Sequence, residues 1–400
     1  MTRGLFVLGL AIFATMLGNG VVMPFIPLYS QQFGADGFTI GILFGSHSAS
    51  RTFLLPFIGR ASDRRGRKEF LLWGLVFYAA ASVAFLLANS LLALTLIMAL
   101  QGVATAMVQP TSMAYVGDLT PKGKEGTYSG YINTAFLGGV AGGPVLGGVV
   151  KDLYSMQASF ILLGILSVLS LLLVWFFLPE VHTEKKTSDT TNLPFREIFS
   201  CRPLVGMSFF RLSYAAANAT IWVFVPLLAA QLLTLSTSEI GLLISLNVLV
   251  STILQAPCGR LADRMKNKVI LIVIGGLLSA VALALFPLAT SYWHLVVLNL
   301  LVGAAFGLAY PAHMAVAMEN AEGFGMGTVM SLLLTVHSFG MTVVPVLFGL
   351  IVDLYSLNSV FYSGGIFGLL VTVACYVFTG LPVAAPQPSA TGEKEPVVAD

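Results

Sequence analysis

Gly59-Arg60-Ala61-Ser62-Asp63-Arg64-Arg65-Gly66-Arg67-Lys68 is the densest run of charge in this 400-residue chain, in which only 10% of residues are charged. It lies between two long apolar segments, so it predicts a short polar connection between two membrane-spanning helices. A matching stretch, Gly259-Arg260-Leu261-Ala262-Asp263-Arg264-Met265-Lys266-Asn267-Lys268, follows two hundred positions later. A basic connection that recurs at half the chain length predicts an internally repeated membrane protein.

The composition excludes an ordinary soluble domain. Hydrophobic residues make up 57% of the chain, and the mean hydropathy is +0.89, so too few polar residues remain to cover a water-facing surface. A single Arg3 precedes the first apolar run, which is too long for a signal peptide and predicts an uncleaved first helix. Cys201, Cys258 and Cys375 are far apart, so we expect neither a disulfide framework nor a metal site.

Twelve apolar segments are long enough to span a bilayer, with six on each side of a polar stretch. We therefore predict an all-α integral membrane protein of twelve helices. The expected spans are 5–29, 38–58, 69–88, 91–117, 126–150, 157–179, 203–230, 238–258, 269–289, 293–317, 326–350 and 357–380.

The distribution of Lys and Arg predicts the orientation. With both termini in the cytoplasm, every Lys and Arg outside the spans except Lys151 falls on the cytoplasmic side. This places the chain in the cell (inner, cytoplasmic) membrane as a multi-pass protein. We expect a six-helix bundle over 1–180, a cytoplasmic linker over 181–202, a second bundle over 203–380 and a disordered tail over 381–400.

The repeat extends well beyond the two basic connections, at offsets of 200 or 201 positions. Two bundles of the same orientation, repeated along an axis normal to the membrane, form a transporter plan with the substrate site between them. The matching pairs are Ile40-Gly41 with Ile240-Gly241, Gln109-Pro110 with Tyr310-Pro311, Asp118 with Glu319, Pro144-Val145-Leu146 with Pro345-Val346-Leu347, and Asp152-Leu153-Tyr154 with Asp353-Leu354-Tyr355.

The first basic connection resembles the signature loop between the second and third helices of the major facilitator superfamily, and the resemblance covers essentially the whole chain. In that family the loop latches the two bundles on the cytoplasmic side. Basic residues retained only for topology would explain the arginines but not the Gly and Asp positions, of which Gly59 is expected to permit close helix approach. The second connection has Lys266-Asn267 in place of Gly66-Arg67, so its gating role is weaker. The gating residues implied are Gly59, Asp63, Gly66, Arg67, Asp118 and Asp263.

The fifth span carries a glycine–proline pattern that resembles a motif of the drug/proton antiporter branch of that family. Gly139, Gly143 and Gly147 are four residues apart, so they predict one helix face on which a neighbouring backbone packs closely. Pro144 removes a helix hydrogen bond and permits a bend. A plain packing face would have the same sequence. The full set is Gly130, Gly139, Gly143, Pro144, Gly147 and Gly148.

Proton coupling fits the sequence less well than the resemblance suggests. Met98 stands where the family's fourth-helix motif has an arginine linked to proton transfer, and no carboxylate lies deep within a span. His47, His313 and His337 remain as proton-coupling candidates, because histidine titrates near neutral pH. Histidines that serve only in packing are the alternative.

Arg51 and Arg211 are placed about eight residues inside their spans, roughly 12 Å deep at 1.5 Å per residue. Either arginine faces the cavity and favours an anion, or it snorkels to the interface as a structural residue. By analogy with the family, the first, fourth, seventh and tenth helices line the cavity. The cavity candidates are Asn19, Arg51, Met98, Gln101, Gln109, Arg211, Tyr214, Asn218, Trp222, Asn299 and Tyr310.

These features predict a secondary transporter that moves a small molecule by alternating access. Efflux of apolar or amphiphilic compounds in exchange for protons follows from the resemblance, and a permease for uptake or export of one specific, anionic metabolite is the alternative. A non-transporting membrane sensor would need an output domain that the chain lacks. We expect no enzyme, catalytic residue, metal, cofactor or nucleic-acid partner, because no nucleotide loop or nucleophile–base pattern occurs. The expected functional unit is a monomer.

Overall fold

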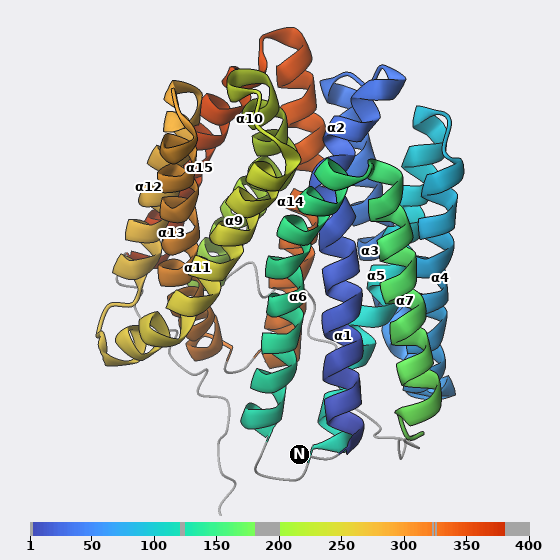
Figure 1. Ribbon diagram of the computed structural model, residues 1–400. Coiled ribbons are helices and arrows are strands. Elements are labelled where there is room, and N and C mark those ends of the chain that lie inside the picture. The colour runs from blue at the N-terminus through green and yellow to red at the C-terminus, as the bar shows by residue number, and fades with distance from the viewer. Residues whose placement is uncertain (1–2, 121–124, 181–200, 322–323, 325, 381–400) are drawn as a thin grey trace, which may run out of the picture.

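The computed structural model of this protein describes residues 3–120, 125–180, 201–321, 324 and 326–380, and the described segments are helices with short connections (Figure 1). The predicted linker and tail fall outside these residues, apart from the linker's last two positions. The elements of the first half are α1 (Arg3–Val22), η1 (Met23–Phe25), α2 (Ile26–Ser30), η2 (Gln31–Phe33), α3 (Gly37–Arg65), α4 (Arg67–Leu87), α5 (Leu91–Leu119), α6 (Glu125–Leu153) and α7 (Met156–Phe177).

The second half of the chain follows the same order. Its first predicted span, 203–230, is interrupted by a π-helical segment, η3, in which one wider turn breaks the regular register. The elements are α9 (Arg202–Ala219), η3 (Thr220–Phe224), α10 (Val225–Leu233), α11 (Thr237–Arg264), α12 (Val269–Leu285), η4 (Phe286–Leu288), α13 (Tyr292–Glu319), α14 (Met326–Leu354) and α15 (Leu357–Gly380).

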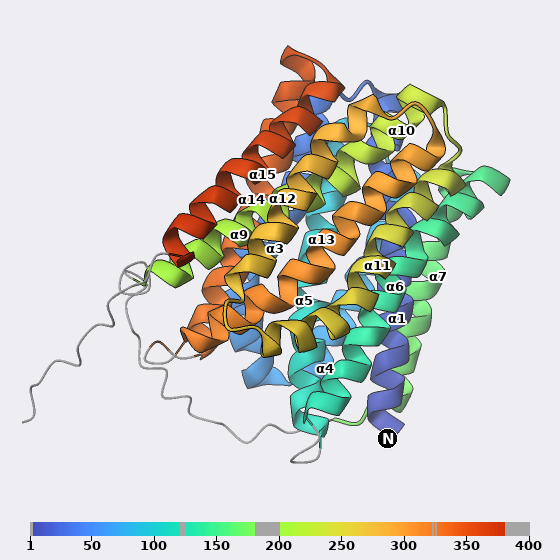
Figure 2. The ribbon, with the colours of Figure 1, turned by 90° about the vertical axis from the view of Figure 1, so that its left-hand side faces the viewer.

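The helices pack as two sets. In the first set, α1–α7, the main contacts are those of α1 with α6 and α7, of α5 with α3 and α4, and of α4 with α7. In the second set, α9–α15, they are those of α13 with α11 and α12, of α12 with α15, and of α9 with α14 and α15. Two helix pairs join the sets, α3 with α14 and α6 with α11. Figure 1 shows the sets side by side, with their ribbons diverging toward its lower end, and Figure 2 shows the second set in front of the first.

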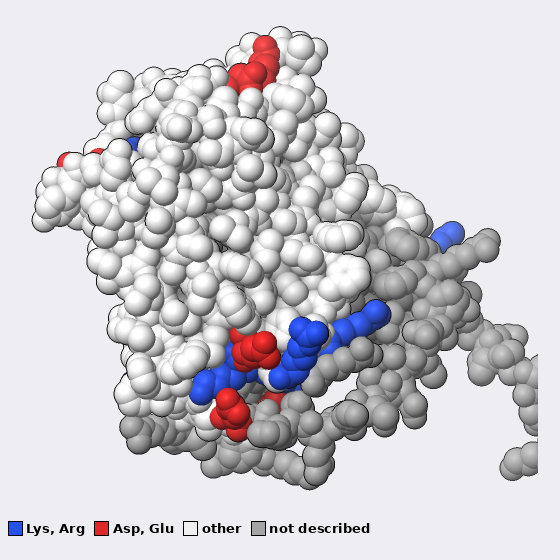
Figure 3. Space-filling view, turned by 90° about the vertical axis from the view of Figure 1, so that its right-hand side faces the viewer, with Lys and Arg blue, Asp and Glu red and all other residues white. Residues whose placement is uncertain are grey.

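Eleven described helical segments are long and apolar enough to cross a membrane. The predicted span at 38–58 is a helix, α3, but it is not among the eleven, because Ser, Gly, His47 and Arg51 interrupt its apolar sequence. This polar helix is one of those that join the two sets. The face in Figure 3 has its charged side chains at the two ends and an uncharged band between them, as expected for a protein within a bilayer.

The predicted polar connection is almost entirely helical. The helix α3 continues to Arg65, Gly66 alone breaks it, and α4 begins at Arg67. Gly66 has φ of 111°, which only glycine adopts without strain. Gly59 was expected to permit close helix approach, but nothing lies within 4 Å of a methyl group placed there. We call the end of the molecule near Gly66 the hairpin end and the opposite end, where α3 begins, the distal end.

Backbones of the two sets touch in the distal half. A methyl group at Gly41 would collide with the backbone of Pro345, and one at Gly241 would collide with the carbonyl of Pro144. The contact of Gly37 with Gly349 is equally close. Such contacts require residues without a side chain, because even a methyl group would separate the backbones.

The hairpin half of the same helices is much less buried. In α3, Ile40, Leu43 and His47 are buried, whereas Ile58 and Ser62 are the only buried side chains described in 51–65. In α11 the described residues 248–264 contain one buried side chain, Ala262. The sets are therefore packed tightly at the distal end and loosely at the hairpin end.

The glycine contact between α6 and α11 gives a stability prediction. Gly241→Ala should lower the unfolding free energy of the detergent-solubilised protein by about 1–3 kcal/mol, because the added methyl forces two helices apart. The melting temperature measures the change. Gly130→Ala, whose methyl meets nothing within 4 Å, is the matched control and should be neutral or stabilising. An equal effect of both substitutions would contradict the close packing described.

Candidate functional site

A ladder of polar side chains joins α3 to α5 in the first set. The imidazole Nε2 of His47 lies 3.3 Å from the Thr105 hydroxyl, which lies 2.8 Å from the Tyr78 hydroxyl. One helical turn farther along, an Arg51 Nη donates to Gln109 Oε1 at 2.7 Å. The i, i+4 spacing in both helices places the two contacts one above the other.

Arg211 of α9 is the corresponding charge in the second set, and only 3% of its surface is exposed. Its Nε donates to the Leu333 carbonyl of α14 at 3.3 Å. Its guanidinium carbon lies 5.9 Å from the ring centre of Tyr214 and 5.6 Å from that of Tyr310. Aromatic faces attract a cation but do not neutralise it.

The aromatic side chains around Arg211 form one cluster, here called the Tyr214 cluster. Tyr214 meets Phe306 edge to face with ring centres 4.6 Å apart, and it lies 5.6 Å from Tyr310 and 5.4 Å from His337. The other members are Phe210 and His313, with ring centres 4.8 Å apart. The sequence predicted Tyr214, Tyr310 and both histidines, whereas Phe210 and Phe306 were missed because they have no polar signal.

The two arginines lie in a region without described negative charge. Arg51 is within electrostatic range of Arg211, and His337 is within range of both. Every Asp and Glu that the structure describes lies in or next to the first or last turn of a helix. The site therefore has positive potential, contributed by both sets.

The remaining cavity candidates differ in their burial and in their hydrogen bonds. Asn19 and Trp222 are half-buried, with Trp222 on the π-helical segment, whereas Met98 is fully enclosed. Asn218 donates to the Tyr214 carbonyl of its own helix at 2.9 Å, and Asn299 donates to the Leu243 carbonyl of α11 at 2.5 Å. Asn218 thus adjoins the Tyr214 cluster, whereas the described hydrogen bond of Asn299 joins α13 to α11.

Several buried polar atoms near these elements have no hydrogen-bond partner. Gln101 is fully buried and has no partner for either amide atom, and Asn19 Oδ1 also lacks one. His337 Nδ1 and Arg51 Nε are in the same condition. Native proteins leave few buried polar groups unpaired, so such atoms mark candidates for ligand contact.

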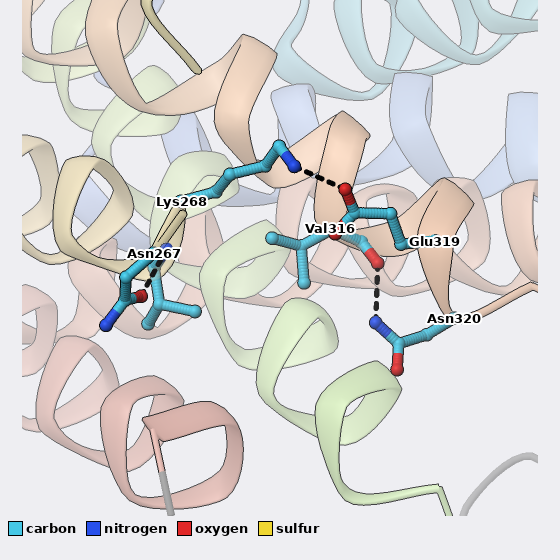
Figure 4. Close-up of polar contacts among 6 residues, drawn as sticks. Asn267, Lys268, Val316, Glu319 and Asn320 are labelled. Atoms are coloured by element: carbon cyan, nitrogen blue, oxygen red, sulfur yellow. Dashed lines mark hydrogen bonds and ion pairs between the residues drawn. The ribbon is translucent and has the colours of Figure 1, made fainter. Parts of the chain in front are cut away.

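The predicted gating residues occupy the hairpin end. Arg67 of α4 pairs with Asp118 of α5, with Nε and Oδ2 2.9 Å apart. Lys268 pairs with Glu319 of α13 in the same arrangement, and Asn267 accepts from the Val269 N–H at 3.2 Å (Figure 4). Each ion pair joins residues of a single set, so it braces neighbouring helices of that set. The side chain of Asp63 is outside the described part, and Asp263 is exposed.

The glycine pattern of α6 faces two neighbours. Gly139, Gly143 and Gly147 lie against the backbone of α1, as a common helix face predicts, while Gly148 meets Thr237 of α11. Gly130 is not part of this face, because a methyl group placed there would have no neighbour within 4 Å. The motif therefore packs α6 within its set and against the other.

Two carboxylates link the sets at the distal end, and we call Asp152 and Asp353 the distal caps. Asp152 ends α6 and accepts from the first N–H groups of α11, Thr237 at 3.0 Å and Ser238 at 2.6 Å. Asp353 ends α14 and accepts from the first N–H groups of α3, Gly37 at 2.7 Å and Phe38 at 2.8 Å. A carboxylate at a helix N-terminus satisfies unpaired N–H groups and the helix dipole.

Each distal cap works beside a cap from the helix's own sequence. Asp36 accepts from the Thr39 N–H at 2.8 Å, and its hydrogen bonds with the Thr39 side chain and backbone lower the pKa of Asp36. In α11, Ser236 and Glu239 form a capping box. The sequence paired Asp152 with Asp353 through the repeat but assigned them no role, although two acids at the same distal position were the available signal.

The distal caps give a prediction about closure. In protein whose three cysteines are replaced by Ala, Ile40→Cys places a thiol at a site that is 1% exposed in the distal interface. Asp353→Asn should raise its labelling rate with N-ethylmaleimide in detergent about fivefold, because roughly 1 kcal/mol of charge-assisted capping is lost.

Asp36→Asn is the matched control for that labelling, because Asp36 caps only its own helix. It should leave the rate nearly unchanged. If both substitutions raise the rate equally, the effect comes from fraying of α3 and not from separation of the two sets.

The sequence of this chain is similar to those of known membrane transporters. A family model described as Major Facilitator Superfamily matches residues 8–216 and again 207–399. An uncharacterised MFS-type transporter of Methanocaldococcus jannaschii is 27% identical over 384 residues, covering 94% of this chain and 98% of the relative. The multidrug resistance protein MdtG of Proteus mirabilis is 27% identical over 374 residues, covering 90% and 92%.

Solved structures share the fold at lower identity. A bacterial homolog of the human lysosomal transporter Spinster, in an inward-facing and unoccupied conformation, has a TM-score of 0.77 at 16% identity and covers 94% of this chain and 95% of its own. The nucleoside transporter NupG has a TM-score of 0.78 at 16% identity and covers 94% and 99%.

Proposed function

This chain belongs to the Major Facilitator Superfamily, and we propose that it is a secondary active transporter that exports apolar or amphiphilic compounds by alternating access. One observation carries the mechanism. The two helix sets are interlocked at the distal end through backbone contacts and the distal caps, and they are loosely packed at the hairpin end. A rocking motion about the centre would exchange which end is closed.

The proposed architecture is two six-helix bundles, 1–180 and 203–380, related by a parallel repeat and joined by a linker. The match of the family model to each half supports the repeat, as does the equivalence of the distal caps. With the termini and the hairpin end in the cytoplasm, the structure corresponds to an inward-facing state of a protein in the cytoplasmic membrane. The basic residues at the hairpin end support this orientation.

The proposed cargo class follows from the Tyr214 cluster. The edge-on and tilted rings of Tyr214, Phe306 and Tyr310 provide a surface for apolar bodies of varied shape. The similarity to MdtG, at 27% identity, agrees with export of such compounds. The ion pairs Arg67–Asp118 and Lys268–Glu319 would keep α4 with α5 and α12 with α13 as rigid units while the gate, with Asp63, opens and closes.

A permease for one specific metabolite, in either direction, is the second candidate. The observation that favours it is the polar ladder of His47, Thr105, Arg51 and Gln109, whose fixed hydrogen bonds suit recognition of a defined polar group. A broad exporter and a specific permease differ in how many unrelated compounds they transport.

Export is tested in cells that lack their own efflux pumps. Cells expressing the chain should accumulate less of several fluorescent amphiphilic compounds than cells with an empty vector, because the protein would remove them. Reduced accumulation of one compound alone would support the permease. Unchanged accumulation across a broad panel would contradict export.

Proton coupling is tested in proteoliposomes with and without an imposed pH gradient. The gradient should accelerate flux through the wild type, and His337→Gln should remove most of that acceleration, since His337 belongs to the Tyr214 cluster and lies within electrostatic range of both arginines. His294→Gln is the control, because His294 is exposed at the distal start of α13. Flux that ignores the gradient in the wild type would rule out antiport with protons.

A further inference from the structure

We infer that Arg51 and Arg211 together form an anion-binding site and that the cargo is an organic anion with an aromatic or apolar body. The inference rests on the proposed transport function and names the charge of its substrate. One arginine comes from each helix set, α3 in the first and α9 in the second.

Arg211 is buried without a counter-charge, because no described acid lies close enough to neutralise it. The residue is only 3% exposed, its Nε donates to a neutral carbonyl, and the described acids lie at helix ends. Burying a charge without a counter-charge in a membrane protein is costly. A bound anion would supply the missing counter-charge.

Arg51 also lacks a described counter-charge. Gln109 accepts one of its hydrogen bonds but is neutral, and Arg51 Nε has no partner. Because Arg51 and Arg211 are in electrostatic range of each other, their repulsion adds to the cost of both. An anion between them relieves the repulsion, and a planar guanidinium suits the two oxygens of a carboxylate or sulfonate.

The internal repeat shows that the charge of Arg51 has no counterpart in the second half of the chain. Ser251 occupies the position in α11 that corresponds to Arg51 in α3. A structural requirement of the fold would apply to both halves, whereas this charge is present once. An unmatched charge at the meeting point of the two sets is expected of a residue that recognises cargo.

The Tyr214 cluster defines the rest of the ligand. Tyr214 and Tyr310 already present their rings to Arg211, and Phe306 extends this surface from α13. A ligand with its negative group at the arginines would lay its body on these rings. The class that fits is an aryl or alicyclic carboxylate or sulfonate, because inorganic anions would leave the aromatic surface uncovered.

The test uses three probes with the same body and different charge: 2-naphthoate, 2-naphthamide and 2-naphthylmethylamine. Binding to the purified full chain in detergent is measured by equilibrium dialysis and by the melting temperature. We expect 2-naphthoate to bind and to raise the melting temperature, and the amide and the amine to bind about tenfold more weakly or worse. Equal binding of the amine or amide, or no binding of 2-naphthoate, would overturn the inference.

Substitutions then assign the charge. Arg51→Gln and Arg211→Gln should each weaken 2-naphthoate binding about tenfold, which corresponds to about 1.4 kcal/mol. Arg202→Gln is the control, because Arg202 is exposed at the start of α9, and should leave binding unchanged. Unchanged affinity in Arg51→Gln would contradict the site.

Gln109→Glu keeps the test decisive if Arg211→Gln fails to fold. The new carboxylate would pair with Arg51 at the position of the present hydrogen bond. It should raise the melting temperature without ligand and weaken 2-naphthoate binding about tenfold, since it competes for the same charge. A purely structural arginine would gain the stability without any loss of binding, which would overturn the inference.

The export experiment separates this inference from the proposed function. If cells export neutral or cationic compounds while 2-naphthoate fails to bind, the anion site is wrong and the transporter stands. If 2-naphthoate binds as expected but no compound is exported, the site stands and export is wrong.

Discussion

Backbone N–H groups at the start of two helices are satisfied by carboxylates that belong to the opposite helix set. Asp353 completes the first turn of α3 and Asp152 completes that of α11, and around them glycines let backbones touch. These contacts are directional, short and confined to the distal end. The rest of the arrangement depends on them, because they hold the two sets together at one end while the other end is loosely packed.

The centre of the molecule has the opposite character. Where the distal end has the negatively charged distal caps, the centre has two positive charges, Arg51 and Arg211. Neutral hydrogen-bonding groups and aromatic rings surround them. Such an arrangement does little for stability, and a packed apolar centre would cost less. The proposed binding of cargo and the proposed rocking motion give this charge and the π-helical turn in the adjoining helix a purpose that stability does not.

Nearly every helix could be predicted from hydropathy and charge, because the need to satisfy backbone hydrogen-bonding groups in a bilayer leaves few alternatives to a helix. The face formed by Gly139, Gly143 and Gly147 was predictable from spacing alone. The pairing of Arg51 with Gln109 was not, because it depends on the rotation of α3 against α5, which no local pattern records. Gly59 was misjudged for a related reason: a small residue permits close approach but does not create a neighbour.

The distal caps are synthesised at different times relative to the helices that they cap. The first turn of α3 obtains its partner from Asp353, 316 residues later in the chain, whereas α11 follows its partner Asp152 by 85 residues. During synthesis from the N-terminus, the Gly37 and Phe38 N–H groups of α3 therefore lack this partner until α14 is made, although Asp36 already caps the Thr39 N–H. The second half of the chain therefore supplies hydrogen-bond acceptors that the first half needs and does not itself encode.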